Sequence, residues 1–431
     1  RLKLYNKAKL LGHPAEGKNW TLINNHGDKT LMRNLLAFDI SKRLRLPYTP
    51  AGRPVNLFLN GEYKGCYQFC DHIDVRKNRV DIKEMKATDI SGNNLTGGYL
   101  VEIDAYANTE KEWFTSGRGN PVTIKSPDDD VITNEQRAYI KNHFNTLESS
   151  IFASNYTHPT AGFRKYMDTE TFLKHFIVGE LSGNTDTYWS VYMYKQRGDD
   201  KFYFGPVWDF DLAFENDQRI YPVNQKSDWI YKYGSAAGNT RNLIDRLLSD
   251  TGLQTDLRTL WSNFRDWGII TPEELLKTVD DYADEMYDSQ ELNFMRWNIR
   301  NEFVHQMWGR STTYAGDVDI VKTYIRDRIA WIDRKINYIP NPDNPNPYSM
   351  STVSNIAVNV WTQDRTIRLN GIREPLVVEI VNITGQAVYK REINKETSFA
   401  VSPGIYIVRV SNPRGHSKHF KIITTFAPSF K

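Results

Sequence analysis

The chain has 431 residues, and its 55 Lys and Arg side chains nearly balance its 52 Asp and Glu, leaving a net charge of +3. This near-neutral balance argues against a nucleic-acid partner, because such proteins normally present a strongly basic surface. The length and the 40% hydrophobic content exclude a disordered protein and predict two or three globular domains. No apolar run approaches the roughly 18 residues that a membrane span needs, so we expect no transmembrane segment.

The N-terminal part predicts strands around one helix. Residues 30–44 place apolar side chains on a single helical face, and Asp28 just before them is suited to cap that helix. Asn60-Gly61 then separates two runs, Val55–Leu59 and Tyr63–Cys70. Because Asn-Gly accommodates the positive φ angles of a type I′ turn, these runs predict a β-hairpin.

Three helix starts are marked further along the chain. Thr133 and Gln136 have the spacing of a capping box, and Asp168 precedes a second helix with a wide apolar stripe. Thr271-Pro272 combines an N-cap with a proline at the first helical position, and Val321–Ile336 carries a last helical pattern. Helices of this kind after a strand-rich beginning predict an α+β fold.

Trp229, Tyr231 and Tyr233 cluster in a polar stretch between residues 221 and 239. Aromatic side chains on a loop can form a platform for a substrate. They can equally fold the loop over its own core. The sequence leaves both interpretations open.

Residues 181–214 carry the candidate chemistry. Asp186 follows the end of an apolar helix and precedes a predicted hairpin made by residues 190–196 and 201–204. The sequence Trp208-Asp209-Phe210-Asp211 comes next, and in an extended backbone its two acids would lie on one face. Two like charges beside so apolar a run require a compensating cation, which is either an Arg or Lys side chain or a metal ion.

Both kinds of cation have a physical rationale. Mg²⁺ typically takes one or two carboxylates together with substrate phosphates, whereas a paired side chain would make the acids a structural salt bridge or a helix cap. The order of Asp186, the predicted hairpin and Asp209 along the chain favours a metal ion over a paired side chain. Protein kinases also present a loop Asp, a short hairpin and then a second Asp that binds metal.

Several separate motifs of this sequence resemble those of the spore-coat CotH kinase-like family, especially of its Bacteroidetes members. They are GNTD, SVYMYK and FGPVWDFDLAF in the stretch above, and LLG, KNWTL, NGEYKG and GGYLVE before it. The resemblance covers about residues 1–340. It implies an atypical protein-kinase-like domain over residues 1–339 that transfers phosphate from ATP to Ser residues of secreted or coat proteins.

The resemblance also implies roles for individual residues. Asp186 would be the catalytic Asp that positions or deprotonates the acceptor hydroxyl, and Asp209 would hold Mg²⁺ (or Mn²⁺) on the nucleotide phosphates, with Asp211 beside it. Ser190 stands where many relatives have Asn, which is a plausible second metal ligand. A hydroxyl can also coordinate Mg²⁺, so Ser190 remains a metal-ligand candidate.

Relatives carry an Arg-Gly-Asn-Ser-Thr-Trp motif followed by a Lys-rich strand, and this chain begins at Arg1-Leu2-Lys3-Leu4, where that strand should already be under way. We therefore expect that the front of the domain is missing, together with the Gly-containing loop that could cover phosphates. The candidates for binding ATP are then Lys18, Arg33 and Glu102. Lys18 and Arg33 could contact phosphates or be ordinary surface charges. Glu102 shares a face of a predicted strand, Tyr99–Ile103, with Asp104, and it is either a site residue or the partner of a nearby arginine.

The C-terminal part differs in pattern. Residues 340–351 include PNPDNPNP and predict a stiff linker, and residues 352–431 contain seven short alternating runs that predict a small antiparallel β-sandwich. The motifs VNITGQ, PGIYIVRV and FKII resemble those of the C-terminal sorting-type β-domains of Bacteroidetes secreted proteins. This resemblance implies export to the periplasm or cell surface of a Gram-negative bacterium, and a plain binding or spacer module is the alternative.

Three functions are therefore carried forward. The first is an extracytoplasmic CotH-like atypical kinase that uses a nucleotide and Mg²⁺ and phosphorylates a protein hydroxyl. The second is a non-catalytic surface or spore-coat-like protein that keeps the fold and binds a protein or a surface polymer. The third is a metal-dependent hydrolase, which rests on the paired acids and the aromatic loop.

Overall fold

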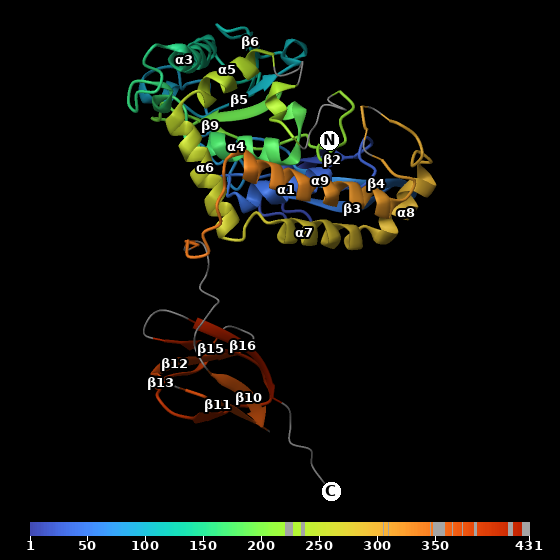
Figure 1. The fold of residues 1–431 in the computed structure, drawn as a ribbon, viewed down its shortest axis with the longest axis vertical. Coiled ribbons are helices and arrows are strands. Elements are labelled where there is room, and N and C mark those ends of the chain that lie inside the picture. The colour runs from blue at the N-terminus through green and yellow to red at the C-terminus, as the bar shows by residue number, and fades with distance from the viewer. Residues whose placement is uncertain are drawn as a thin grey trace. The chain divides into compact units, whose positions relative to one another are not determined.

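The computed structural model describes residues 1–219, 227–233, 238–304, 306–308, 310–344, 346–347, 358–363, 365–372, 374–382, 386–412 and 417–424. The chain divides into two compact units, Arg1–Asn344 and Pro345–Lys431. The fold is α+β, with helices packed beside antiparallel sheets in the first unit and strands forming the second (Figure 1). None of the described helices is long and apolar enough to cross a membrane.

The first sheet of unit 1 has the strand order β1-β2-β4-β3 and is drawn in blue in Figure 1. Its strands are antiparallel neighbours. They are β1 (Leu2–Ala8), β2 (Gly17–Ile23), β3 (Gly52–Leu59) and β4 (Glu62–Asp71). Helix α1 (Arg33–Arg43) follows β2 and contacts β3.

The predicted hairpin and helix are both present in this part. Asn60 and Gly61 connect β3 to β4 with φ angles of 52° and 81°, as a type I′ turn requires. Helix α1 begins at Arg33, later than residue 30, because Asp28 organises a turn before it. The Asp28 carboxylate accepts hydrogen bonds from the backbone N–H groups of Thr30 (2.9 Å) and Arg33 (2.8 Å).

A second, five-stranded sheet in unit 1 has the order β6-β7-β5-β8-β9. Its strands are β5 (Tyr99–Asp104), β6 (Trp113–Thr115), β7 (Pro121–Ser126), β8 (Ser190–Lys195) and β9 (Phe202–Phe204). The antiparallel pairing of β8 with β9 confirms the hairpin expected after Asp186. The central strand β5 carries Glu102 next to β8.

Three helices of unit 1 begin where the sequence indicates. Thr133 and Gln136 form a capping box, Asp168 accepts a hydrogen bond from the Thr171 N–H, and Thr271 caps a helix that starts with Pro272. The helices after α1 are α2 (Gly92–Leu95), α3 (Asn134–Phe152), α4 (Thr169–Ser182), α5 (Gly238–Leu248), α6 (Thr251–Asp266), α7 (Pro272–Glu285), α8 (Tyr287–Arg296) and α9 (Tyr314–Lys335). Short 3₁₀ turns are η1 (Ala107–Thr109), η2 (Phe163–Lys165), η3 (Thr185–Tyr188) and η4 (Ile230–Lys232).

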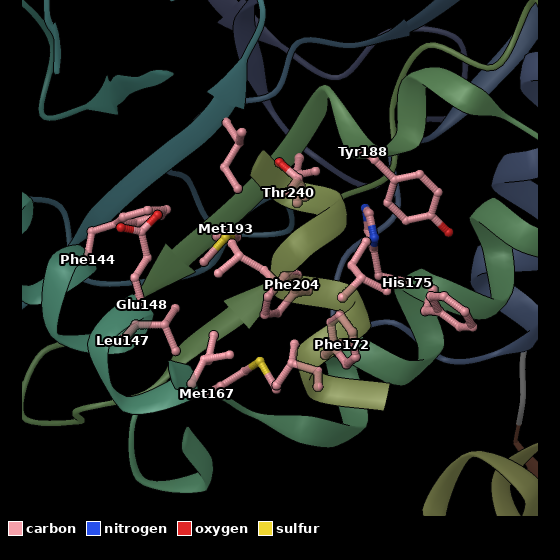
Figure 2. Close-up of a pocket in the computed structure, with 17 residues that line it drawn as sticks. Phe144, Leu147, Glu148, Met167, Phe172, His175, Tyr188, Met193, Phe204 and Thr240 are labelled. Carbon is pink, nitrogen blue, oxygen red and sulfur yellow. The ribbon is translucent and has the colours of Figure 1, made fainter. Parts of the chain in front are cut away.

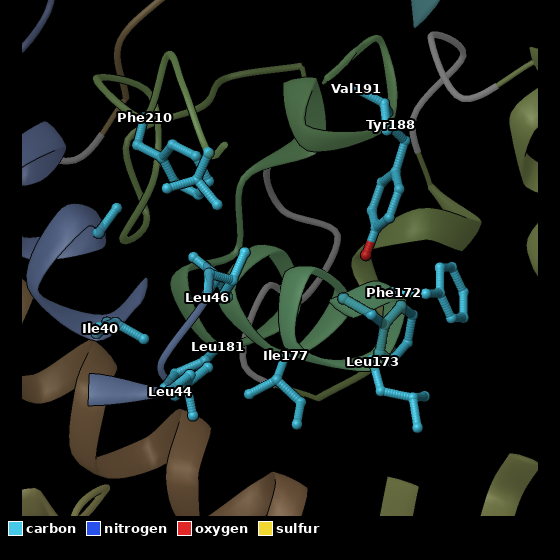
Figure 3. Packing of buried hydrophobic residues seen from close by; sticks show 14 of the residues in the cluster. Ile40, Leu44, Leu46, Phe172, Leu173, Ile177, Leu181, Tyr188, Val191 and Phe210 are labelled. Atoms are coloured by element: carbon cyan, nitrogen blue, oxygen red, sulfur yellow. The ribbon is translucent and has the colours of Figure 1, made fainter. Parts of the chain in front are cut away.

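One hydrophobic core joins these elements (Figure 3). Ile40 comes from α1 and Ile177 and Leu181 come from α4, whereas Tyr188 and Phe210 come from the two loops that carry the candidate acids. All five side chains are buried. Both loops are therefore anchored in the same core, which restricts the motion of one acid relative to the other.

The aromatic loop belongs mainly to this core. Trp229 and Tyr231 are buried and lie against Phe176 of α4, with ring centroids 5.4 Å and 6.0 Å away. Tyr233 is 38% exposed. For Trp229 and Tyr231 the structure favours the core interpretation over a substrate platform. Residues 220–226 and 234–237 of this stretch lie outside the described residues.

Unit 2 consists of two antiparallel sheets with the orders β10-β11-β14 and β13-β12-β15-β16, shown in orange and red in Figure 1. The strands are β10 (Asn359–Gln363), β11 (Thr366–Asn370), β12 (Leu376–Asn382), β13 (Ala387–Ile393), β14 (Thr397–Ala400), β15 (Gly404–Ser411) and β16 (Ser417–Thr424). Ile367 and Phe399 of one sheet share a hydrophobic cluster with Val378 and Val408 of the other. Residues 383–385, which are part of the VNITGQ motif, lie outside the described residues.

Candidate functional site

Asp186 lies where the sequence places it, directly after α4. The helix ends at Gly183 in the left-handed region with φ 69°, and a side chain at this position would meet the Tyr324 hydroxyl at 2.2 Å. Glycine therefore allows the sharp exit from the helix. The next residues form η3, which presents Asp186 with 25% of its side chain exposed.

A buried ion pair between Glu180 and Arg328 helps to fix this loop. Glu180 of α4 lies 2.9 Å from Nη2 of Arg328. The same carboxylate accepts hydrogen bonds from the Tyr188 hydroxyl (2.6 Å) and from the backbone N–H groups of Ile230 (2.7 Å) and Tyr231 (3.0 Å). Burial raises the pKa of Glu180, and these donors act against that shift. Tyr188 is in η3, so the network fixes the turn that holds Asp186.

The segment around Asp209 is not extended, which corrects the expected alternation of Asp209 and Asp211. Asp209 has φ 64°, and a left-handed residue interrupts a strand. Three hydrogen bonds hold the segment in place: Asn184 Nδ2 donates to the Asp209 carbonyl (2.9 Å), the Phe210 N–H donates to Asn34 Oδ1 (2.6 Å), and Arg33 Nε donates to the Ala213 carbonyl (2.9 Å). An outlying backbone angle supported in this way is typical of functional sites.

The acids lie close enough for their charges to interact. Solvent reaches the Asp209 side chain, yet burial is the largest cause that raises its pKa to about 7. Asp209 is thus exposed although many protein atoms surround it, and we call the surroundings of its carboxylate, which include Asp186, Asp211 and Glu102, the acidic recess. Asp211, Asp186 and Glu102 raise the same pKa further, and Arg219 lowers it. Among these described groups acids outnumber cations, and a bound cation would relieve their repulsion.

Glu102 and Ser190 contact each other at one side of this recess. Ser190 Oγ donates a hydrogen bond to Glu102 Oε1 (2.5 Å), and Lys125 Nζ of β7 lies 3.1 Å from Glu102 Oε2. Burial raises the pKa of Glu102, and Lys125 counteracts this shift. The partner of Glu102 is thus a lysine and not an arginine. Lys125 was missed because its strand carries no motif, and only the sheet register brings it to β5.

The other two candidates occupy different environments. Lys18 is exposed on β2 in the four-stranded sheet. Arg33 is fully buried; it pairs with Asp28 and donates to the Ala213 carbonyl. In this arrangement Arg33 supports the Asp209 segment, and a contact with phosphate would require it to exchange these partners.

Within the described residues, no group of three or more His, Cys, Asp or Glu side chains is arranged to hold a metal ion by itself. Asp209 and Asp211 could still hold Mg²⁺ with substrate phosphates, because this ion commonly takes only one or two protein carboxylates. The hard oxygen donors and the excess negative charge around Asp209 fit such an ion.

A separate cavity in unit 1 has a different character. It lies among α3, α4, α5 and β8, and Figure 2 shows its lining residues. Phe144, Phe172 and Met193 contribute apolar surface, and the cavity has a volume of about 40 Å³. The Glu148 carboxylate at its edge already accepts hydrogen bonds from Ser116 and Asn120. This cavity is a packing defect of the core and not a phosphate site.

Unit 1 is an antiparallel α+β unit in which Asp186 and Asp211 lie close enough to Asp209 for their charges to act on it. Residues 1–332 match the family described as CotH kinase protein. Because the match covers most of the chain, the protein belongs to the CotH kinase protein family. No curated protein matches the sequence. The resemblances to Bacteroidetes members and to sorting-type β-domains stay predictions.

Proposed function

We propose that this member of the CotH family is an atypical kinase that transfers the γ-phosphoryl group of ATP to a hydroxyl of a protein. The observation that carries the proposal is the recess in which Asp211, Asp186 and Glu102 act on Asp209, whose pKa is raised to about 7 by burial and by these acids. Strongly shifted carboxylates in an accessible recess are characteristic of functional sites. The family match supports the reaction class.

Asp209 and Asp211 would hold Mg²⁺ or Mn²⁺ in this proposal. A bound divalent ion would neutralise the charge of the nucleotide phosphates. The backbone of the Asp209 segment is fixed by Asn184 and Asn34, so the carboxylates are oriented before the ligand arrives. Ser190 Oγ is bonded to Glu102 and would reach the ion only if it released that bond.

Asp186 would act on the acceptor. Its Oδ1 atom lies 2.9 Å from Arg219, which leaves Oδ2 for a hydrogen bond from the acceptor hydroxyl. The hydroxyl oxygen would attack the γ-phosphorus, its proton would pass to Asp186, and the bond from the phosphorus to the bridging oxygen would break. That oxygen would keep the electron pair, and ADP would leave.

Lys125 is the proposed contact for the nucleotide phosphates. It is paired with Glu102 at the edge of the recess, which is the kind of Lys–Glu pair that protein kinases use to hold phosphates. Lys125 also lines a polar pocket of about 150 Å³, together with Arg1, His72 and Arg76.

The proposal also covers the domain type of each unit and the location of the protein. Unit 1 would be a protein-kinase-like domain, and unit 2 would be a β-sandwich of the sorting type, since its two antiparallel sheets share one hydrophobic cluster. The protein would then act outside the cytoplasm, in the periplasm or at the cell surface of a Gram-negative bacterium. Its partners would be a nucleotide and a protein acceptor.

A non-catalytic binding protein is the second candidate. The observations that favour it are the ion pair that already engages Asp186 with Arg219 and the presence of Ser190 where many relatives have Asn. Such a protein would keep the recess as a structural feature. It would bind a protein or a surface polymer without nucleotide.

Thermal unfolding with ATP, MgCl₂ and both together separates the candidates. We expect a synergistic stabilisation, about 2.7 kcal/mol when the ligand is at 100 times its Kd. The variant Asp209→Asn should lose it, and Asn suits this position because it tolerates a positive φ. Asp281→Asn is the matched control, because it removes an exposed acid of α7. Loss of synergy in both variants, or its absence from the wild type, would contradict the kinase proposal.

A further inference from the structure

Arg219 links the candidate catalytic acid to a buried carboxylate. Its Nη2 atom lies 2.9 Å from Asp186 Oδ1 and 2.7 Å from Asp217 Oδ2. Its Nε atom donates to Asp217 Oδ1 over 2.9 Å. The Asp217 side chain is fully buried, whereas the Arg219 side chain is 33% exposed. The buried Asp217 therefore holds the Nε–Nη2 edge of the guanidinium, and Nη2 also reaches Asp186.

Asp217 is itself held in a defined position. It accepts a hydrogen bond from Thr185 Oγ1, one residue before Asp186, and from the backbone N–H of Arg219 (2.9 Å). The carboxylate thus has donors on both oxygens, and it orients the Arg219 side chain as a bidentate partner does. Among the described residues, Nη1 of Arg219 has no hydrogen-bond partner, so that atom can donate to a ligand.

The position of Arg219 relative to both acids gives it a place in the reaction. It contacts Asp186 directly, and its positive charge also acts on Asp209. A phosphoryl group in transit must lie between the acid that faces the acceptor and the acid that holds the metal. Arg219 therefore borders the same space as the transferring group.

We propose that Arg219 contacts the transferring phosphoryl group through Nη1 while Nη2 holds Asp186 in place. The role rests on the proposed kinase function. In the transfer, charge spreads over the three equatorial oxygens of the phosphoryl group as the bond to ADP breaks and the bond to the acceptor oxygen forms. A planar, permanently charged guanidinium stabilises that arrangement better than an ammonium group does.

A purely structural role predicts something different. Arg219 would then only neutralise the buried Asp217, and a lysine at this position would supply the same charge. The ammonium group of lysine is a compact point charge without the planar fork of arginine, so it cannot keep the bidentate contact with Asp217 and also reach Asp186 and a phosphoryl oxygen. The variant Arg219→Lys therefore distinguishes contact with the ligand from support of the fold.

The test is thermal unfolding with MgCl₂ and ADP, with and without aluminium fluoride, which mimics the planar transferring phosphoryl group. In the wild type we expect Mg·ADP to stabilise the protein and aluminium fluoride to add a second increment. Arg219→Lys should keep the Mg·ADP shift and bind the fluoride complex about 100-fold more weakly. Arg241→Lys is the matched control, because Arg241 makes an exposed pair with Asp245 on α5.

The outcomes separate this role from the proposed function. No stabilisation of the wild type by Mg·ADP would overturn the kinase proposal and the role of Arg219 with it. A Mg·ADP shift without a fluoride increment in the wild type, or with the full increment in Arg219→Lys, would overturn only the role of Arg219. If Arg219→Lys unfolds without ligand, Arg219→Gln is the second variant: it should keep the Mg·ADP shift and lose the fluoride increment, and a full increment would overturn the role of Arg219.

Discussion

Two charged clusters flank the turn that carries Asp186, and they are built in opposite ways. In the first cluster, Glu180 is fully surrounded by donors from Arg328, Tyr188 and the η4 backbone. In the second cluster, Asp211, Asp186 and Glu102 raise the pKa of Asp209, and Arg219 lowers it. The protein itself neutralises Glu180, whereas Asp209 has more acids than cations among the described groups that act on it most strongly.

This difference indicates which cluster serves the fold and which serves a ligand. A buried acid with a complete set of partners is consistent with a structural role, because nothing more can bind to it. Like charges held together in an accessible recess raise the free energy of the folded state unless a cation arrives. The comparison therefore assigns support to Glu180 and ligand binding to Asp209, and each assignment can be tested.

The largest effect is expected from Glu180→Ala. It leaves the fully buried Arg328 without its carboxylate partner, which should lower the free energy of unfolding by about 3–5 kcal/mol. Glu170→Ala is the matched control on the same helix, because Glu170 is exposed and pairs only with Lys174; we expect a change of about 0.5 kcal/mol or less. Urea denaturation measures both. Equal losses in the two variants would contradict the structural role of Glu180.

His175 tests whether the interior tolerates a charge that has no partner. Burial lowers its pKa from 6.5 to about 4, so the folded protein keeps the ring neutral while the unfolded chain takes up a proton. Stability should fall as the pH drops from about 6.5 to about 4, by about 3 kcal/mol from this residue. His175→Leu, at the edge of the apolar cavity in Figure 2, should reduce that loss. An unchanged pH dependence in urea denaturation would contradict the prediction.

Much of the fold could be predicted from local sequence. The β3–β4 hairpin, the capping box at Thr133 and the cap at Asp168 follow from turn and capping chemistry that acts within a few residues. The start of α1 was predicted too early, because Leu31 adopts a positive φ of 61° within the turn that Asp28 organises. Such a turn depends on a side chain that competes with the helix for backbone donors.

The candidate site was only partly predictable. Asp186 and the hairpin after it were placed correctly, because an apolar helix and alternating strands surround them. Lys125 and Arg219 were missed, since each reaches the site through tertiary contacts that no local pattern encodes. Asp209 was assigned to an extended segment, whereas Asn184 and Asn34, distant in the sequence, hold it in a left-handed conformation.

The pH dependence of cation binding sharpens the assignment of Asp209. The carboxyl is half protonated at a pH of about 7, and only the ionised form binds a divalent ion. Affinity for Mg·ATP should therefore fall about tenfold for each pH unit below 7, or about 1.4 kcal/mol per unit, and level off above 7. Calorimetric titration from about pH 5.5 to pH 8.5 measures this. A flat profile would mean that Asp209 is not a ligand of the ion.

The smallest effect has the opposite sign from the first and concerns the protein without ligand. Since the pKa of Asp209 is raised from 3.8 in the fold, its ionisation costs stability as the pH rises from about 4 through about 7. Asp209→Asn removes that charge and tolerates φ 64°, so it should stabilise the protein at pH 8 by about 1 kcal/mol or less, because solvent screens an accessible group. At about pH 4 the gain should vanish, since wild-type Asp209 is then neutral.

Urea denaturation at the two pH values tests both statements, with Asp281→Asn as the control that loses an exposed ion pair with Lys277. A loss of stability in Asp209→Asn at pH 8 would show that the fold pairs this carboxylate after all, and the contrast with Glu180 would no longer hold.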